Sequence, residues 1–234
     1  MGLAKRFESL KGMPGAQDVR RRFKAYAAFN KMLTPMAKYY ASEMSMRTSN
    51  GAVAVLGGSG YMKDYPVERY LRDARITTIY EGTSQLQVVA AIAGVTGGLV
   101  PEDILAGVAC DGDEALAAAR ARMQALGQDL ADALAYVHAH PGGKAYHDLH
   151  ARQLVDAAIA VVVSALFIRF AAKFPEKKAA LDFWIQTRFP AARAALEQAR
   201  SGFLAPVTDF ERIAPLPPLT DEASPSAAVS CSFP

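Results

Sequence analysis

Glu81 is the acidic residue of this sequence that is best placed to act as a chemical base. It stands between Tyr80 and Gly82, just before an apparent helix start at Ser84. A carboxylate on a short, partly apolar turn can lose its water, and desolvation raises its pKa toward the range useful for a general base. The alternative is a structural acid that interacts favourably with the dipole of the following helix.

The residues after Glu81 predict that helix. Ser84 and Gln87 have the S-x-x-Q spacing of a capping box. Apolar residues then repeat at helical intervals, at Leu86, Val89, Ala90 and Ala93. The free backbone N–H groups of a helix start can bind a phosphate, a cofactor hydroxyl or a developing oxyanion.

A glycine-rich stretch, Leu56-Gly-Gly-Ser-Gly-Tyr61, precedes this region. Its glycines at positions 57, 58 and 60 are expected to form a turn whose backbone a pyrophosphate can approach closely. A Gly-Gly-x-Gly pattern alone is weak evidence for such a site.

The order of the motifs is more specific than any one of them. Gly-Gly-x-Gly-Tyr61, Asp64-Tyr-Pro-Val-Glu-Arg-Tyr and Ile79-Tyr-Glu-Gly-Thr-Ser-Gln85 follow one another in a fixed order, within one run that needs no gap. This run, from about Met32 to about Val95, resembles the C-terminal helical domain of the flavin-dependent acyl-CoA dehydrogenases. One departure is Ala54, which stands where the family commonly has a glutamine that contacts the flavin nucleotide.

The resemblance implies a reaction and a role for Glu81. The Glu81 carboxylate would remove the pro-R α-proton of an acyl-CoA thioester while a hydride leaves the β-carbon for the flavin. The Glu81 backbone N–H and a ribityl hydroxyl of FAD would bind the thioester oxygen. Electrons would then pass to an electron-transfer flavoprotein.

The resemblance also implies which residues contact the ligands. Substrate-lining residues would be Tyr80 and Gly82. FAD-contacting residues would be Leu56, Gly57, Gly58, Thr83 and Gln85, with most of the FAD held by a neighbouring subunit.

Composition describes a globular chain with no marked charge. The 234 residues are 51% hydrophobic and carry a net charge of +3, which favours neither a nucleic-acid-binding nor a disordered protein. The longest apolar run, 157–168, is too short for a membrane span and predicts a buried core helix. Cys110 and Cys231 are too isolated for a disulfide framework, and no signal peptide is recognisable, so a cytoplasmic location is expected.

Helical periodicity in every apolar segment predicts an all-α fold. We expect a helical bundle at 1–98, a second helical domain at 99–204 and a flexible tail at 205–234. Within the first domain, Thr34-Pro35 is expected to start a new helix or to kink the existing one. The second domain should contain three helices, beginning near Asp113, Tyr146 and Pro175, and its pattern is similar to the extra C-terminal domain of longer family members.

Four histidines, at positions 138, 140, 147 and 150, suggest a metal site only weakly, and we expect none. The family's N-terminal helical domain and central β domain have no counterpart in this sequence. A fragment or subunit of a larger enzyme is therefore expected, completed by a homo-oligomer or by another chain. The alternative is a non-catalytic helical interaction module that keeps the motif but binds no flavin.

Overall fold

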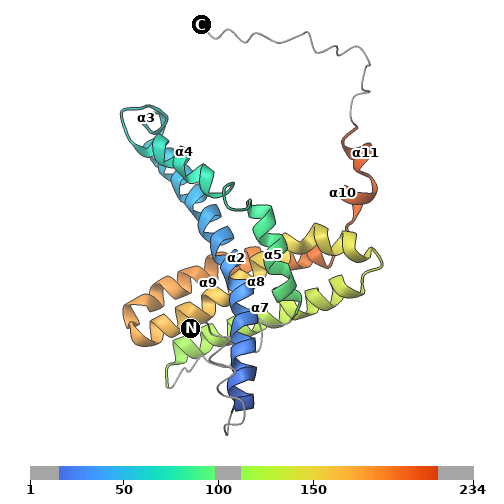
Figure 1. The fold of residues 1–234 in the computed structure, drawn as a ribbon. Helices are drawn as coiled ribbons and strands as arrows, with labels where there is room; N and C mark the ends of the chain where they lie inside the picture. Colours follow the sequence, from blue (N-terminus) through green and yellow to red (C-terminus); the bar gives the residue numbers. More distant parts are fainter. Residues whose placement is uncertain (1–15, 98–111, 216–234) are drawn as a thin grey trace. The chain divides into compact units, whose positions relative to one another are not determined.

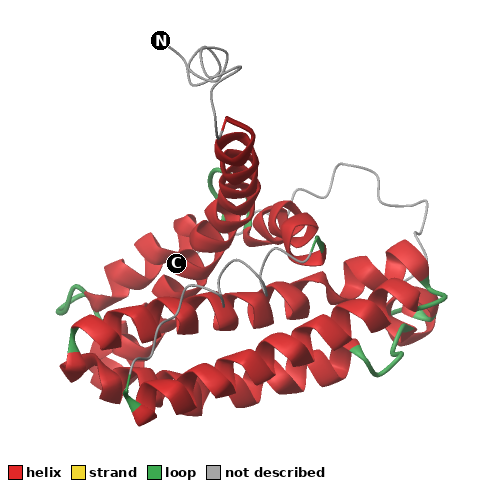
Figure 2. Ribbon diagram, turned by 90° about the horizontal axis from the view of Figure 1, so that it is seen from below, coloured by secondary structure: helices red, strands yellow, loops and turns green. Residues whose placement is uncertain are grey.

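A computed structural model of the protein describes residues 16–97 and 112–215. Regular structure in these residues is helical throughout, without a strand, as Figure 2 shows. The predicted all-α class is therefore confirmed. The chain divides into two compact units, residues 1–203 and 204–234.

The longest helix, α2 (Ala16–Leu56), runs without interruption through Pro35. The predicted start of a new helix at this proline is therefore wrong, whereas the alternative, a kink within one continuous helix, stays a prediction. Pro35 lies on the same buried face as Met32, Met36 and Tyr39. Packing of that face continues on both sides of the proline and offsets the loss of one backbone hydrogen bond.

Three helices follow α2 and pack against it: α3 (Gly58–Tyr61), α4 (Val67–Thr77) and α5 (Ser84–Thr96). Helix α5 lies close along α2, because a Cβ added to Gly94 would stand 2.6 Å from the Met32 Cβ. Figure 1 shows α4 returning along α2, so that the loop between α4 and α5 is presented beside the middle of α2.

The second half of this unit is built from α7 (Glu114–Ala139), α8 (Gly143–Lys173) and α9 (Lys178–Ala199), with the short 3₁₀ turn η1 (Pro175–Lys177) before α9. We call these three helices the α7–α9 bundle; they lie side by side in Figures 1 and 2. The sequence predicted each of them. Asp113 caps α7 by accepting a hydrogen bond from the Leu116 N–H at 3.2 Å, and its pairing with Lys178 holds its pKa below the usual range.

Helix α8 is the core of the bundle. Ala157, Val161, Ala165 and Ile168 are at most 1% exposed, which confirms the buried core helix predicted for 157–168. By length and composition alone α8 could span a membrane, but 67% of its most apolar stretch is buried inside the chain. Such burial is typical of the central helix of a helical bundle.

The second unit begins with two short helices, α10 (Ala205–Thr208) and α11 (Phe210–Ile213). The tail predicted from residue 205 thus begins with two single helical turns, and its flexibility stays a prediction. Residues 216–234, the two cysteines and the 98/99 boundary lie outside the described residues. That boundary stays a prediction, although α2 and α5 both contact α8 within one compact unit.

Candidate active site

Glu81 lies in an unusual backbone conformation. The turn that carries it, residues 78–83 and here called the Glu81 turn, connects α4 to α5. Glu81 has φ 51°, and it is the one non-glycine residue with positive φ in the described ranges; Gly82 follows with φ 93°. A left-handed glutamate costs conformational energy and persists only where surrounding contacts hold it.

The first set of such contacts comes from Lys38 in the middle of α2. Its Nζ donates to the Thr77 carbonyl at 2.8 Å and to the Gly82 carbonyl at 2.7 Å. It also lies 5.5 Å from the centre of the Tyr80 ring. A partly buried ammonium that binds both ends of a turn fixes its width, because charge-assisted hydrogen bonds are short and strong.

The second set comes from the start of α5. The Gln87 Nε2 donates to the Glu81 carbonyl at 2.9 Å, and the Ser84 N–H donates to the Thr78 carbonyl at 3.1 Å. A Cβ on Gly82 would stand 2.8 Å from the Gln87 Nε2. Gly82 is therefore needed both for its positive φ and for this side-chain contact.

The helix cap differs from the predicted capping box by one residue. Thr83, not Ser84, is the N-cap, and its Oγ1 accepts from the Leu86 N–H at 3.4 Å. Gln87 turns toward the Glu81 turn instead of the cap. Thr83 and Ser84 both have the hydroxyl that a cap requires, so spacing alone could not separate them.

The outer face of the turn is exposed. Tyr80 and Glu81 are both exposed, so the described residues do not supply the desolvation expected for the carboxylate. No described group accepts a hydrogen bond from the Glu81 N–H. The turn thus presents a carboxylate and a free backbone donor from the same residue, which is suited to a substrate that loses a proton next to a carbonyl.

Comparison with known proteins identifies the segment. The acyl-CoA dehydrogenase C-terminal domain model matches residues 16–95. Residues 16–95 belong to the acyl-CoA dehydrogenase C-terminal domain family. The predicted resemblance is therefore confirmed for the segment that contains the Glu81 turn.

The acyl-CoA dehydrogenase segment has similar relatives in animals and bacteria. It is 58% identical over 53 residues to the mitochondrial short/branched chain specific acyl-CoA dehydrogenase of Rattus norvegicus, covering 23% of this chain and 12% of that protein. An acyl-CoA dehydrogenase of Bacillus subtilis is 51% identical over 63 residues, covering 27% and 17%. The short-chain specific enzyme of Megasphaera elsdenii is 49% identical over 63 residues, covering 27% and 15%. The chain thus spans less than a fifth of the length of these relatives.

The glycine-rich stretch at residues 56–61 forms the expected turn only in part. Helix α2 continues to Leu56, and the chain reverses at Gly57 with φ 58°. A Cβ added to Gly57 or Gly58 would meet nothing within 4 Å, whereas one on Gly60 would stand 2.4 Å from the Val53 carbonyl oxygen. Gly60 is therefore a packing residue between α3 and α2, and the expectation that it leaves space for a pyrophosphate is wrong.

The sequence did not reveal the residues of α2 that hold the Glu81 turn. Lys38 precedes its two acceptors by 39 and 44 residues. Ser42, one turn further along α2, donates to the Thr77 carbonyl at 2.9 Å. The one signal was their spacing: positions 38 and 42 lie one above the other on the helix face that meets α4.

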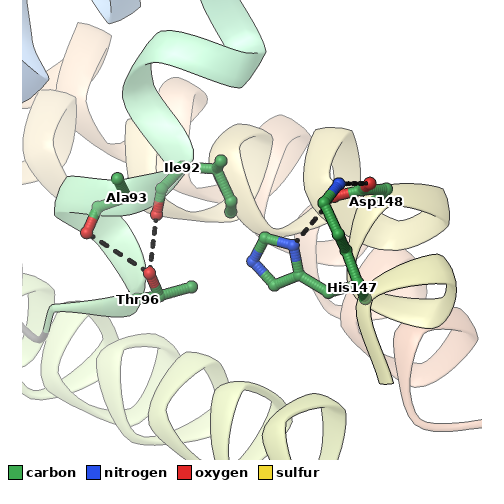
Figure 3. A network of polar contacts seen from close by, with 6 residues as sticks. Ile92, Ala93, Thr96, His147 and Asp148 are labelled. Carbon is green, nitrogen blue, oxygen red and sulfur yellow. Dashed lines mark hydrogen bonds and ion pairs between the residues drawn. The ribbon is translucent and has the colours of Figure 1, made fainter. Parts of the chain in front are cut away.

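His147 and His150, beyond the acyl-CoA dehydrogenase segment, contact neighbouring polar groups. His150 is 1% exposed, with its Nε2 3.2 Å from the Phe203 carbonyl oxygen. Figure 3 shows the His147 ring projecting from α8 toward α5, with its Nδ1 3.3 Å from the Asp148 carboxylate. In the same view the Thr96 hydroxyl donates to the carbonyl oxygens of Ile92 and Ala93 in α5. The described part of the chain contains no group of three or more metal-ligating side chains.

Proposed function

We propose that this chain forms the catalytic-base portion of an FAD-dependent acyl-CoA dehydrogenase, with Glu81 as the α-proton base. The observation that carries the proposal is the geometry of the Glu81 turn. Lys38 and Gln87 hold Glu81 in a left-handed conformation, while its carboxylate and N–H remain available. An exposed surface acid would not need this restraint.

The chain's own groups would act on the substrate in two ways. The Glu81 carboxylate would accept the proton from the α-carbon of the thioester, which becomes more acidic as its carbonyl oxygen gains negative charge. The Glu81 N–H would donate to that oxygen and stabilise the charge. Tyr80 and Gly82 would border the acyl chain, since both flank Glu81 and Tyr80 is exposed. FAD, when bound, would supply the acceptor for the hydride from the β-carbon.

Two places on this chain fit a flavin dinucleotide. At the first, Leu56 is 40% exposed and the backbone of Gly57 and Gly58 is open to close approach. At the second, Thr83 and Gln85 are exposed at the N-terminus of α5, where backbone N–H groups and the helix dipole favour anionic or hydroxyl-bearing ligands. These sites would hold only part of the cofactor.

The rest of the site would come from other protein. Exposed apolar side chains surround both places, among them Tyr61, Tyr65, Tyr70, Ile79 and Leu86. We propose that further domains or a second copy cover this surface and supply the desolvation that Glu81 lacks here. An electron-transfer flavoprotein as the electron acceptor and a cytoplasmic location are part of the same proposal.

The deciding experiment replaces Glu81 by glutamine in the complete FAD-loaded enzyme that contains this chain. Glu81→Gln keeps the size and hydrogen-bonding capacity of the side chain but removes the base. Stopped-flow reduction of the flavin by a saturated acyl-CoA should slow by about a hundredfold to ten-thousandfold, with FAD content unchanged. Glu114→Gln is the matched control, because Glu114 is also an exposed acid beside a helix N-terminus.

A reduction rate for Glu81→Gln within about threefold of the parent enzyme would exclude the catalytic role. Failure of the parent enzyme to take up FAD, or to bleach with any acyl-CoA, would favour the non-catalytic interaction module. The Glu114→Gln variant should match the parent in both measurements.

A further inference from the structure

A polar cluster joins the α7–α9 bundle to α2. The Tyr39 hydroxyl on α2 donates to the Asp156 carboxylate on α8 at 2.8 Å. Arg152, one turn before Asp156, lies 5.3 Å from the centre of the Tyr39 ring and 3.6 Å from the Glu43 carboxylate. Burial raises the pKa of Tyr39 well above its usual range, with a further rise from the Asp156 charge, so the phenol remains a donor.

Glu43 extends this cluster to the Glu81 turn. One carboxylate oxygen faces Arg152, and the other accepts from the Ser84 hydroxyl at 2.6 Å. The Ser84 N–H in turn donates to the Thr78 carbonyl at the opposite end of the Glu81 turn. An unbroken series of polar contacts therefore leads from α8, through Glu43, to the backbone that carries Glu81.

The contacts of Glu43 differ in strength. The bond from Ser84 is short and charge-assisted, and the Glu43 side chain is only 32% exposed. Arg152 is 54% exposed and 3.6 Å away, so solvent screens this ion pair and it contributes little by itself. The role that remains for Arg152 is to orient the carboxylate toward Ser84.

We propose that Glu43 is a positioning residue, which links the Glu81 turn to Arg152 of α8 and so makes the α7–α9 bundle part of the catalytic framework. The proposal deepens the proposed function and rests on it for its catalytic half. Its structural half, that Glu43 restrains the turn, stands on the contacts of this chain. The two halves have separate readouts.

The structural half is tested by amide hydrogen exchange in the 234-residue chain. Glu43→Ala removes the acceptor of the Ser84 hydroxyl. The turn should then open more often, and hydrogen exchange of the Ser84 amide should accelerate about tenfold or more. Glu43→Gln keeps a carbonyl oxygen for the Ser84 hydroxyl, so its exchange should stay within about threefold of the parent. Arg193→Ala is the matched control, since it breaks an α7–α9 ion pair to Asp129 at 3.0 Å.

The catalytic half is tested by flavin reduction in the complete FAD-loaded enzyme. Glu43→Ala should lower the maximal rate of flavin reduction about tenfold or more and leave the half-saturating acyl-CoA concentration nearly unchanged. Glu43→Gln should recover most of that rate. Arg152→Met, which keeps an apolar stem over Tyr39, should give a smaller loss that is not additive with Glu43→Ala.

The outcomes are distinct. Faster Ser84 exchange in Glu43→Ala but not in Arg193→Ala, with a reduced maximal rate, supports the proposal. Unchanged Ser84 exchange in Glu43→Ala overturns it, whatever the rate. Faster exchange with an unchanged maximal rate also overturns it, because the turn would then move without catalytic effect. A parent enzyme that does not reduce flavin contradicts the proposed function, and the exchange measurement still decides whether Glu43 restrains the turn.

Discussion

The two halves of the main unit bury their apolar residues to very different extents. In the α7–α9 bundle, Met123, Leu130, Leu154 and Ile185 are at most 1% exposed. In the stretch from α3 to α5, Val88, Ile92 and Val95 are buried. Many other large apolar side chains there are about half exposed or more, including Tyr61 82%, Tyr70 58%, Ile76 53% and Leu86 58%. The bundle buries most of its large apolar side chains, with exceptions such as Phe183 at 70% exposed, whereas the segment with the proposed site leaves more of them uncovered.

This difference shows how the site is organised. The inner side of the Glu81 turn is fixed by contacts to α2, such as the two bonds from Lys38. Its outer side is apolar and uncovered in this chain. A general base needs both a fixed position and a surrounding that excludes water. The chain supplies the first, and the second would come with the protein that covers the exposed side.

The largest effect on stability should come from the core of the bundle. Leu154→Ala leaves a cavity at a position that is 0% exposed, and should lower the free energy of unfolding by about 2 to 5 kcal/mol. Leu86→Ala, on the exposed face of α5, should change it by about 0.5 kcal/mol or less. Urea denaturation of the two variants measures the difference.

The Leu154→Ala and Leu86→Ala variants should also differ in self-association. Leu86→Ala is expected to reduce self-association in sedimentation velocity, because it removes part of the exposed apolar surface. If the two substitutions lowered the free energy of unfolding equally, the proposed difference in burial between the two halves would be wrong.

The sequence predicted the helices well because each carries its own local signal. Asp113 precedes an apolar repeat that starts α7, and Pro141 with the following glycines ends it. Local signals failed where packing decides. Pro35 sits inside α2 because its flanking residues are buried, and burial depends on helices far away in the sequence.

A second, smaller effect should appear at the glycine-rich stretch. Gly60→Ala places a Cβ 2.4 Å from the Val53 carbonyl oxygen, so α3 must shift, at a cost of about 1 to 3 kcal/mol. Gly58→Ala meets nothing within 4 Å and should be neutral or slightly stabilising in this chain. Thermal unfolding followed by circular dichroism distinguishes the two.

Gly58→Ala and Gly60→Ala should also differ in their effect on function. In the complete enzyme Gly58→Ala should weaken FAD binding, because its methyl group would occupy the open approach to the backbone. A Gly58→Ala variant that unfolds as early as Gly60→Ala would show that this part of the stretch is a packing element, not an open surface.

The motifs of the candidate site were recognisable, but the contacts that shape it were not. Glu81 and Gly82 follow from the Tyr-Glu-Gly-Thr pattern. The sequence around Lys38 and Glu43 does not indicate their hydrogen-bond partners, which lie 39 to 44 residues away. Only the packing of α2 against α4 and α5 brings them together. The cover that we propose for Glu81 would likewise come from other protein.

The smallest effect should be a pH dependence confined to the bundle. Burial lowers the pKa of His150 below its ordinary value of 6.5, and nearby His140 lowers it further. With its Nε2 placed to donate to the Phe203 carbonyl, the Nδ1 is buried without a hydrogen-bond partner. A proton added at Nδ1 would therefore be a buried donor with no acceptor, which agrees with the direction of the shift.

The sign of the pH effect follows from proton binding. The unfolded chain takes up a proton on His150 at a higher pH than the folded chain, so the stabilising contribution is complete above pH 6.5 and is lost as pH falls below it. His150→Gln keeps a donor for the Phe203 carbonyl but cannot titrate. Between pH 7.5 and 5.0 the Tm of the parent should fall more than that of His150→Gln, by a few degrees or less, whereas the exposed-site control His138→Gln should follow the parent. Equal pH dependence in all three proteins would mean that His150 is as free to bind a proton in the folded bundle as in the unfolded chain, and that the bundle is less closed around it than its 1% exposure indicates.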